Sequence, residues 1–147
     1  MSRTYIKKAI RKKVLEQAQG MCEYCKSPRA YATELFTLDH IIPISKDGSN
    51  TANNLAYCCS GCNIFKSDII VILADNEQEW ITLYHPRTQD WSKHFAWSED
   101  YKEIIGLTPS GRVTVELLRL NRNSLKNLRE VLVVVGKHPP ITIRKEE

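Results

Sequence analysis

The sequence lacks a hydrophobic run long enough to cross a bilayer. Its longest apolar stretches, Ile69–Ala74 and Val131–Val135, fall far below the roughly 18 residues that a membrane-spanning helix needs. Residues 1–13 lack the apolar centre of a secretion signal, and no segment is repeated or of low complexity. We therefore expect a cytoplasmic protein with no membrane partner. A chain of 147 residues suits one compact domain, or a small domain with an appended lobe.

The sequence also lacks the even number of cysteines that a set of disulfides would use. Four of its five cysteines form two CxxC pairs, Cys22/Cys25 and Cys59/Cys62. Two such pairs supply the four thiolates that structural zinc prefers. The pairs are farther apart than the usual spacing of about 15–20 residues, which indicates that further structure is built between them. CxxC spacing selects Cys59 rather than Cys58 as a ligand; redox chemistry or plain buried thiols are the alternatives.

Positive charge is concentrated near the N-terminus. The formal net charge is +4, yet residues 1–30 carry eight Lys/Arg and two Glu, a sum of +6. Apolar residues at spacings of three and four predict a helix over residues 4–19. Its remaining surface carries Lys7, Lys8, Arg11 and Lys12. A basic end on a nearly neutral body favours a polyanion such as DNA as partner, and a merely solvated helix face is the alternative.

The segment between the CxxC pairs predicts two strands and a helix. β-Forming residues over Thr33–Asp39 indicate one strand, and Ile41–Ile44 could continue as the return strand. Thr51–Asn54 is predicted to form a single helical turn, and Asn63–Leu73 a helix with an apolar face. The expected core is therefore a ββα unit with the second CxxC pair at the start of its helix.

The remainder predicts an accessory lobe. Short strands are expected at Trp80–Tyr84 and Lys93–Trp97. Thr108-Pro109 resembles an N-cap followed by proline in the first turn, which opens a helix to about Leu120, and another helix begins at Asn123-Ser124. The predicted fold class is α+β, with a helix and zinc core in residues 1–74 and a mostly helical lobe of uncertain role in residues 75–147.

Asp39, His40 and Asn63 combine two candidate metal ligands with a candidate general base. A carboxylate and an amide oxygen are hard ligands that suit Mg²⁺ or Mn²⁺. Imidazole titrates near neutrality and suits a general base. Because adjacent side chains on a strand point to opposite faces, a bend at the strand end is needed to bring Asp39 and His40 to one substrate.

The pattern CxxC…DHIIP…NNL…CxxCNxxK over about residues 20–68 strongly resembles the HNH endonucleases, or ββα-metal nucleases. The resemblance implies that His40 deprotonates a water for attack on DNA, while Asp39 and Asn63 hold the divalent ion at the scissile phosphate. It implies that Asn54 braces the loop behind His40 and that Lys66 meets a phosphate. The expected products carry 3′-OH and 5′-phosphate ends.

The third family position departs from many relatives, which carry histidine where this chain has Asn63. Amide oxygen is harder than imidazole nitrogen, so Mg²⁺ or Mn²⁺ is expected rather than Zn²⁺ or Ni²⁺. With a single carboxylate the ion should bind weakly until a DNA phosphate completes the site. The sequence thus predicts a divalent-metal-dependent DNA endonuclease. A non-catalytic zinc-containing module that binds nucleic acid is the main alternative, and a structural or protein-interaction zinc domain is the third.

Overall fold

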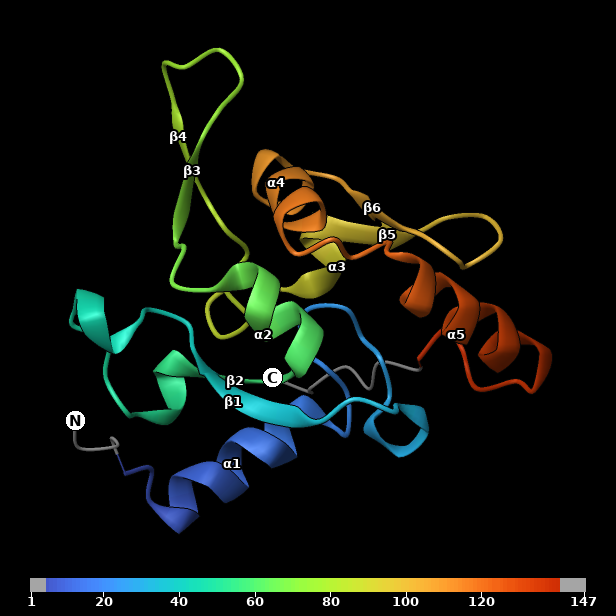
Figure 1. Ribbon diagram of the computed structural model, residues 1–147, viewed down its shortest axis with the longest axis horizontal. Helices are drawn as coiled ribbons and strands as arrows, with labels where there is room; N and C mark the ends of the chain where they lie inside the picture. The colour runs from blue at the N-terminus through green and yellow to red at the C-terminus, as the bar shows by residue number, and fades with distance from the viewer. Residues whose placement is uncertain (1–4, 141–147) are drawn as a thin grey trace.

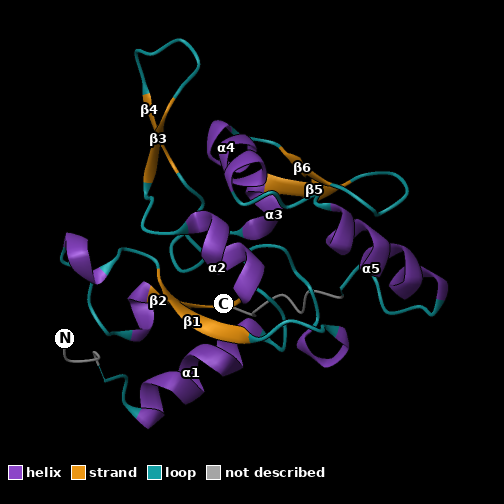
Figure 2. Ribbon diagram, in the orientation of Figure 1, coloured by secondary structure: helices purple, strands orange, loops and turns teal. Residues whose placement is uncertain are grey.

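The computed structural model describes residues 5–140. A two-stranded sheet and a short helix lie at its centre (Figures 1 and 2). Strand β1 (Phe36–His40) pairs antiparallel with β2 (Leu55–Cys59), with Phe36 opposite Cys59 and His40 opposite Leu55. Helix α2 (Ser60–Lys66) follows directly and packs on both strands. The mixed α+β class and the ββα core are as predicted.

The return strand lies elsewhere than predicted. Residues 41–54 form a loop with two 3-10 turns, Ile44–Lys46 and Ala52–Asn54, and the chain pairs with β1 only from Leu55 onward. Four of the five β2 residues are buried. Because β2 is the more buried segment, it pairs with β1 in place of the Ile-rich segment that follows β1. The predicted single turn at residues 51–54 is present as a 3-10 turn.

Helix α2 is shorter than predicted and begins earlier. It spans Ser60–Lys66 and ends at Ser67, whose φ is 52°. Residues that were expected to continue the helix instead form β3 (Val71–Leu73), which pairs with β4 (Trp80–Thr82) in a hairpin that projects from the body (Figure 1). The run of β-branched residues before Leu73 favours a strand over a helix once a partner strand is available.

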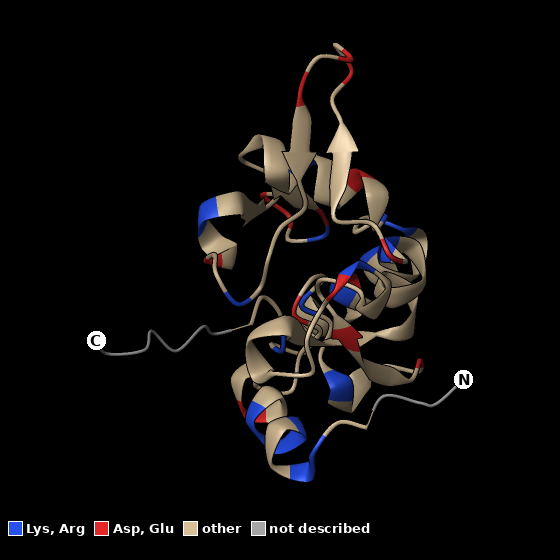
Figure 3. Cartoon of the chain, turned by 90° about the vertical axis from the view of Figure 1, so that its left-hand side faces the viewer, with Lys and Arg blue, Asp and Glu red and all other residues tan. Residues whose placement is uncertain are grey.

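Helix α1 (Lys8–Ala18) carries the basic end of the chain. It packs on β2 and on the 3-10 turn at Ala52–Asn54, so the sheet lies between α1 and α2 (Figure 1). Val14 and Ala18 are its buried residues. Figure 3 shows Lys and Arg positions gathered along α1. Lys7, Lys8, Arg11 and Lys12 are all exposed.

The C-terminal half combines helices with two small hairpins. Its remaining elements are α3 (Trp91–His94), β5 (Phe95–Trp97), β6 (Ile104–Gly106), α4 (Pro109–Leu117) and α5 (Asn123–Val134). The side chain of Thr108 accepts a hydrogen bond from Gly111 N, and Pro109 stands in the first turn, so the predicted N-cap is present. Within residues 5–140, no helix is long and apolar enough to span a membrane.

One hydrophobic core joins the two halves of the chain. Its buried residues include Cys22 and Tyr24 from the N-terminal half and Leu83, Phe95 and Leu118 from the C-terminal half. The division near residue 74 stays a prediction; that position lies in the hairpin between β3 and β4. The shared core means that C-terminal residues contribute directly to the surroundings of both CxxC pairs.

Candidate functional site

The four cysteines of the CxxC pairs meet in one buried cluster. The sulfurs of Cys22, Cys25, Cys59 and Cys62 all lie within 4.8 Å of one another, and Cys25 Sγ lies 3.8 Å from Cys59 Sγ. A tetrahedral zinc ion with Zn–S bonds of about 2.3 Å would place its sulfurs about 3.8 Å apart. The cluster therefore fits a structural zinc ion, which would have no open position for substrate.

Cys58 stands apart from this cluster, as CxxC spacing predicts. It is fully buried on β2, next to the ligand Cys59, but its sulfur is not part of the group of four. Burial raises the pKa of the Cys58 thiol far above its ordinary range, so this thiol stays protonated. A protonated thiol is a poor metal ligand and a poor nucleophile.

Two arginines from the C-terminal half bind side chains in the two CxxC segments. Arg122 donates from Nη2 to Cys59 Sγ at 3.5 Å and from Nη1 to Cys62 Sγ at 3.7 Å. Arg87 forms a buried two-bond ion pair with Glu23, in which Nη2 lies 2.7 Å from Oε2. Glu23 Oε2 also accepts from the Tyr57 backbone N–H at 2.7 Å. Each CxxC turn is thus tied to the later part of the chain.

A groove of about 440 Å³ brings together the residues expected to carry the reaction. Asp39 and His40 at the end of β1 and Asn63 on α2 all line it, together with Ser67 and Asp68. Asp39 and His40 both line the groove although they are adjacent on β1, and both are paired regularly with β2, Asp39 opposite Ala56 and His40 opposite Leu55. Carboxylate, imidazole and amide groups therefore border one space that is open to a substrate.

The carboxylate of Asp39 already has two side-chain partners, Tyr24 and Lys66. It is 6% exposed, and its Oδ2 accepts from the Tyr24 hydroxyl at 3.0 Å and lies 3.1 Å from Lys66 Nζ. Burial raises the pKa of Asp39, and the Lys66 charge opposes that rise. Burial and the nearby Asp39 charge raise the pKa of Tyr24, so its hydroxyl keeps its proton and donates a hydrogen bond to the carboxylate.

Lys66 is an interior residue in this fold. It is 2% exposed and its Nζ also donates to the backbone oxygens of His40 (3.4 Å) and Ile41 (3.2 Å). The ammonium therefore binds the backbone at the end of β1 as well as the Asp39 carboxylate. A contact between Lys66 and a DNA phosphate, as the family resemblance implies, would require the ammonium to leave Asp39.

Asn54 fastens the loop between β1 and β2. Its Oδ1 accepts from Ile42 N at 2.8 Å, and its Nδ2 donates to Ile42 O and to Ser49 O, both at 2.9 Å. Its own backbone oxygen accepts from Ile41 N at 2.9 Å. Ile42 lies two residues after His40, so this buried amide fixes the backbone that carries the imidazole.

His40 has a side-chain partner that the sequence does not indicate. His40 Nε2 lies 2.6 Å from Asn50 Oδ1, and Asn50 Nδ2 donates to the backbone oxygen of Tyr5 at 3.2 Å. By contrast, the amide of Asn63 makes no side-chain hydrogen bond with any other residue in the range 5–140. The Asn63 amide is therefore free to bind a ligand in the groove.

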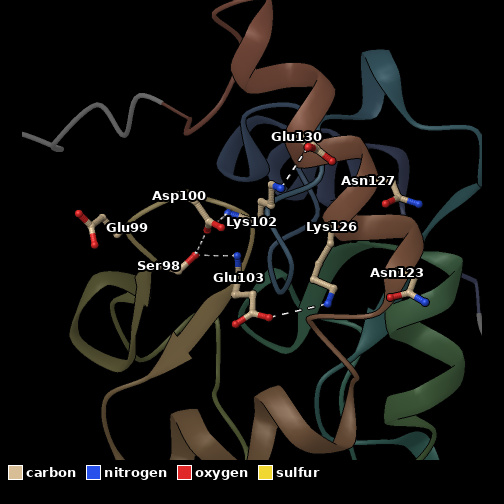
Figure 4. Close-up of a pocket in the computed structure, with 9 residues that line it drawn as sticks. All are labelled: Ser98, Glu99, Asp100, Lys102, Glu103, Asn123, Lys126, Asn127 and Glu130. Carbon is tan, nitrogen blue, oxygen red and sulfur yellow. Dashed lines mark hydrogen bonds and ion pairs between the residues drawn. The ribbon is translucent and has the colours of Figure 1, made fainter.

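A second cavity lies elsewhere in the described chain. It has a volume of about 770 Å³ and lies between the β5–β6 connection and α5 (Figure 4). Its two lysines are paired with carboxylates: Lys102 with Glu130 at 3.1 Å and Lys126 with Glu103 at 3.7 Å. The lining contains no histidine or cysteine, and besides these two pairs it carries the carboxylates of Glu99 and Asp100.

Comparison with known proteins identifies the segment that contains the groove. Residues 22–68 match the family model described as HNH endonuclease. Searches of curated proteins and of solved structures gave no match. The match begins at the first zinc-type cysteine and ends two residues after Lys66, so it covers the cysteine cluster, both strands and α2. The predicted resemblance is confirmed for residues 22–68, which match the HNH endonuclease family model.

Proposed function

We propose that this chain is a divalent-metal-dependent DNA endonuclease that hydrolyses phosphodiester bonds to 3′-OH and 5′-phosphate ends. The groove lined by Asp39, His40 and Asn63 within an HNH domain carries this proposal. These residues offer a base and two hard oxygen donors around one space. No other cavity described above combines an imidazole with such donors.

His40 is proposed to be the general base. Its ring lines the groove, and in the proposed reaction it accepts a proton from the water that attacks the phosphorus. Asn54 holds the loop behind it through Ile42 and Ser49. A base needs a defined position relative to the phosphate, because a displacement of about 1 Å can lower a rate about a hundredfold. Asn54 therefore supports the reaction without contact with DNA.

Asp39 and Asn63 are proposed to hold the catalytic Mg²⁺ or Mn²⁺. Both supply oxygen atoms, which such ions prefer, and both line the same groove. When bound, the ion would stabilise negative charge on the leaving oxygen. The Asp39 carboxylate is free for this role only when the Lys66 ammonium, now 3.1 Å away, has moved. Lys66 and the ion therefore compete for one carboxylate.

The basic helix α1 is proposed to bind the DNA backbone. Lys7, Lys8, Arg11 and Lys12 are exposed, and only Lys12 of these has an ion-pair partner in the described chain, Glu16 at 4.0 Å. Each phosphate contact adds about 0.9 to the slope of log affinity against log salt. Replacing these four residues by Gln should flatten that slope. Replacing exposed Lys93 on α3 and half-buried Lys126 on α5 by Gln should leave it nearly unchanged.

A plasmid-nicking assay tests the activity directly. We expect nicking with Mg²⁺ or Mn²⁺, little with Zn²⁺ or Ni²⁺, and none after chelation of the catalytic ion. His40→Ala should abolish nicking while DNA affinity and the thermal midpoint stay close to those of the unmodified chain. If His40→Ala nicks DNA as fast as the unmodified chain, His40 is not the base. Asn127→Ala, an exposed substitution on α5, is the matched control.

Binding of nucleic acid without cleavage is the second candidate function. The ion pair between Lys66 and Asp39 favours it, because the carboxylate that would hold the ion already has a buried counter-charge. In that case the chain would bind DNA with a steep salt dependence and never nick it, with any of the four metal ions. The two functions therefore give opposite results in the same plasmid assay.

A further inference from the structure

Asn50 lies between His40 and the segment that leads into the basic helix. Its two amide atoms have different partners: Oδ1 lies 2.6 Å from His40 Nε2, and Nδ2 donates to Tyr5 O at 3.2 Å. A backbone carbonyl can only accept hydrogen bonds. The NH₂ group of Asn50 must therefore face Tyr5, and the amide orientation follows from its partners.

This orientation determines which nitrogen of His40 carries the proton. With its NH₂ group turned to Tyr5, Asn50 offers only an oxygen to His40, and an amide oxygen can only accept. Nε2 of a neutral His40 must then hold the hydrogen, which leaves the lone pair on Nδ1. None of the residues in the described range hydrogen-bonds to Nδ1. The basic nitrogen is thus the one that no protein group occupies.

A second asparagine fixes the position of Asn50 itself. Asn54 Nδ2 donates to the carbonyl oxygen of Ser49, the residue directly before Asn50, and to that of Ile42. Asn54 therefore holds both ends of the loop, and Asn50 spans from the loop to the imidazole. Asn54 acts on the backbone behind His40, whereas Asn50 acts on the ring.

We propose that Asn50 is a positioning residue for His40: it selects the Nε2–H form of the imidazole and ties the ring to the backbone of Tyr5, at the entry to α1. The proposal deepens the proposed nuclease function, since it identifies Nδ1 as the atom that would take the proton from water. It also places the base and the DNA-binding helix in one hydrogen-bonded unit. A change at the start of α1 would reach the imidazole through a single side chain.

The protonation form of the ring can be read without any activity measurement. Long-range proton–nitrogen spectra of ¹⁵N-labelled protein distinguish a protonated ring nitrogen from one with a lone pair. Spectra should be recorded at about pH 9, above the usual titration range of imidazole. We expect His40 in the Nε2–H form. In Asn50→Ala the signals should move toward a mixture of both forms. Asn50→Asp keeps an acceptor for Nε2–H and should restore the original form.

Cleavage kinetics supply the second readout. We expect Asn50→Ala to lower kcat about tenfold to a hundredfold, as losses of groups that orient a functional side chain commonly do, with little change in KM for DNA. Asn50→Asp should recover part of kcat, and Asn127→Ala should change neither the spectra nor the kinetics. Thermal midpoints would show whether each variant is folded.

The two proposals fail in different ways. If His40 in the unmodified chain is found in the Nδ1–H form, or if Asn50→Ala leaves the ring signals unchanged, the role of Asn50 is refuted whatever the activity. If the ring responds as expected but no variant, including the unmodified chain, cleaves DNA, the positioning role stands and the nuclease function fails.

Discussion

Replacement of Lys66 by methionine tests the most consequential contact of the site. Lys66 and Asp39 form an ion pair of 3.1 Å in which the side chains are 2% and 6% exposed. Methionine keeps much of the length of lysine but lacks its charge. The change leaves a buried carboxylate whose only remaining side-chain partner in the described chain is the Tyr24 hydroxyl. Removing one partner of a buried pair costs about 3–5 kcal/mol of stability.

The loss should depend on pH in a defined direction. Burial already raises the pKa of Asp39, and Lys66 opposes the rise, so Lys66→Met should raise it further. A carboxyl whose folded pKa lies above its unfolded value of about 3.9 stabilises the fold at low pH and loses that contribution as the pH rises through the folded pKa. Urea unfolding should therefore show a larger deficit at pH 8 than at pH 5.

Magnesium should stabilise the Lys66→Met variant more than the unmodified chain. Without the ammonium, Asp39 is free to bind the ion, so Lys66→Met should bind Mg²⁺ more tightly. Ion at a hundred times its Kd would return about 2.7 kcal/mol of stability. The double variant Lys66→Met/Asp39→Asn removes both charges and should gain nothing from Mg²⁺. If Mg²⁺ stabilises Lys66→Met no more than the unmodified chain, the ammonium and the ion do not compete for Asp39.

Three further predictions concern other parts of the chain. Arg87→Met breaks the buried pair with Glu23 and should lower the free energy of unfolding by about 3 kcal/mol, measured by urea unfolding; an unchanged midpoint would contradict the pairing. In Gly48→Ala the added Cβ would lie 1.7 Å from Ile42 O, so the loop must move and cleavage should fall about a hundredfold in the nicking assay; full activity would show that the loop tolerates displacement. Burial lowers the pKa of His138, so its contribution to stability is present above about pH 6.5 and is lost as the pH falls through the folded pKa; His138→Gln should flatten the pH dependence of the thermal midpoint in this range, and an equally steep loss would refute the assignment.

Short-range chemistry made part of this site predictable from the sequence. CxxC spacing identifies Cys59 rather than Cys58 as the fourth member of the cluster, because two sulfurs on one turn reach the same ion. The DH pair and Asn63 were predicted as site residues, and all three line the groove. The N-cap at Thr108 follows from a local preference for a hydroxyl before proline in the first turn. None of these inferences needs knowledge of distant contacts.

Long-range packing decided what the sequence could not predict. Residues 67–73 were expected to be helical, but the helix ends at Lys66 and Val71–Leu73 form a strand, because Trp80–Thr82 pairs with them. Lys66 has the same sequence neighbours whether it is solvated or buried, and only its packing against Asp39 distinguishes the two. Asn50 and Tyr24 carry no motif signal, since each contacts the site residues through the fold. Local patterns therefore identify chemical groups, whereas tertiary contacts determine their partners.

The guanidinium contacts on the outside of the cysteine cluster have a consequence for protein engineering. The segment that matches the family ends at residue 68, yet Arg87 and Arg122 belong to its immediate surroundings. A fragment that ends at residue 68 and is inserted into a host protein would retain every residue of the family motif. In that fragment Glu23 would lack its ion-pair partner Arg87. The sulfurs of Cys59 and Cys62 would lack their hydrogen bonds from Arg122. The fragment that can be transferred with its contacts intact therefore extends beyond residues 22–68, at least to Arg122.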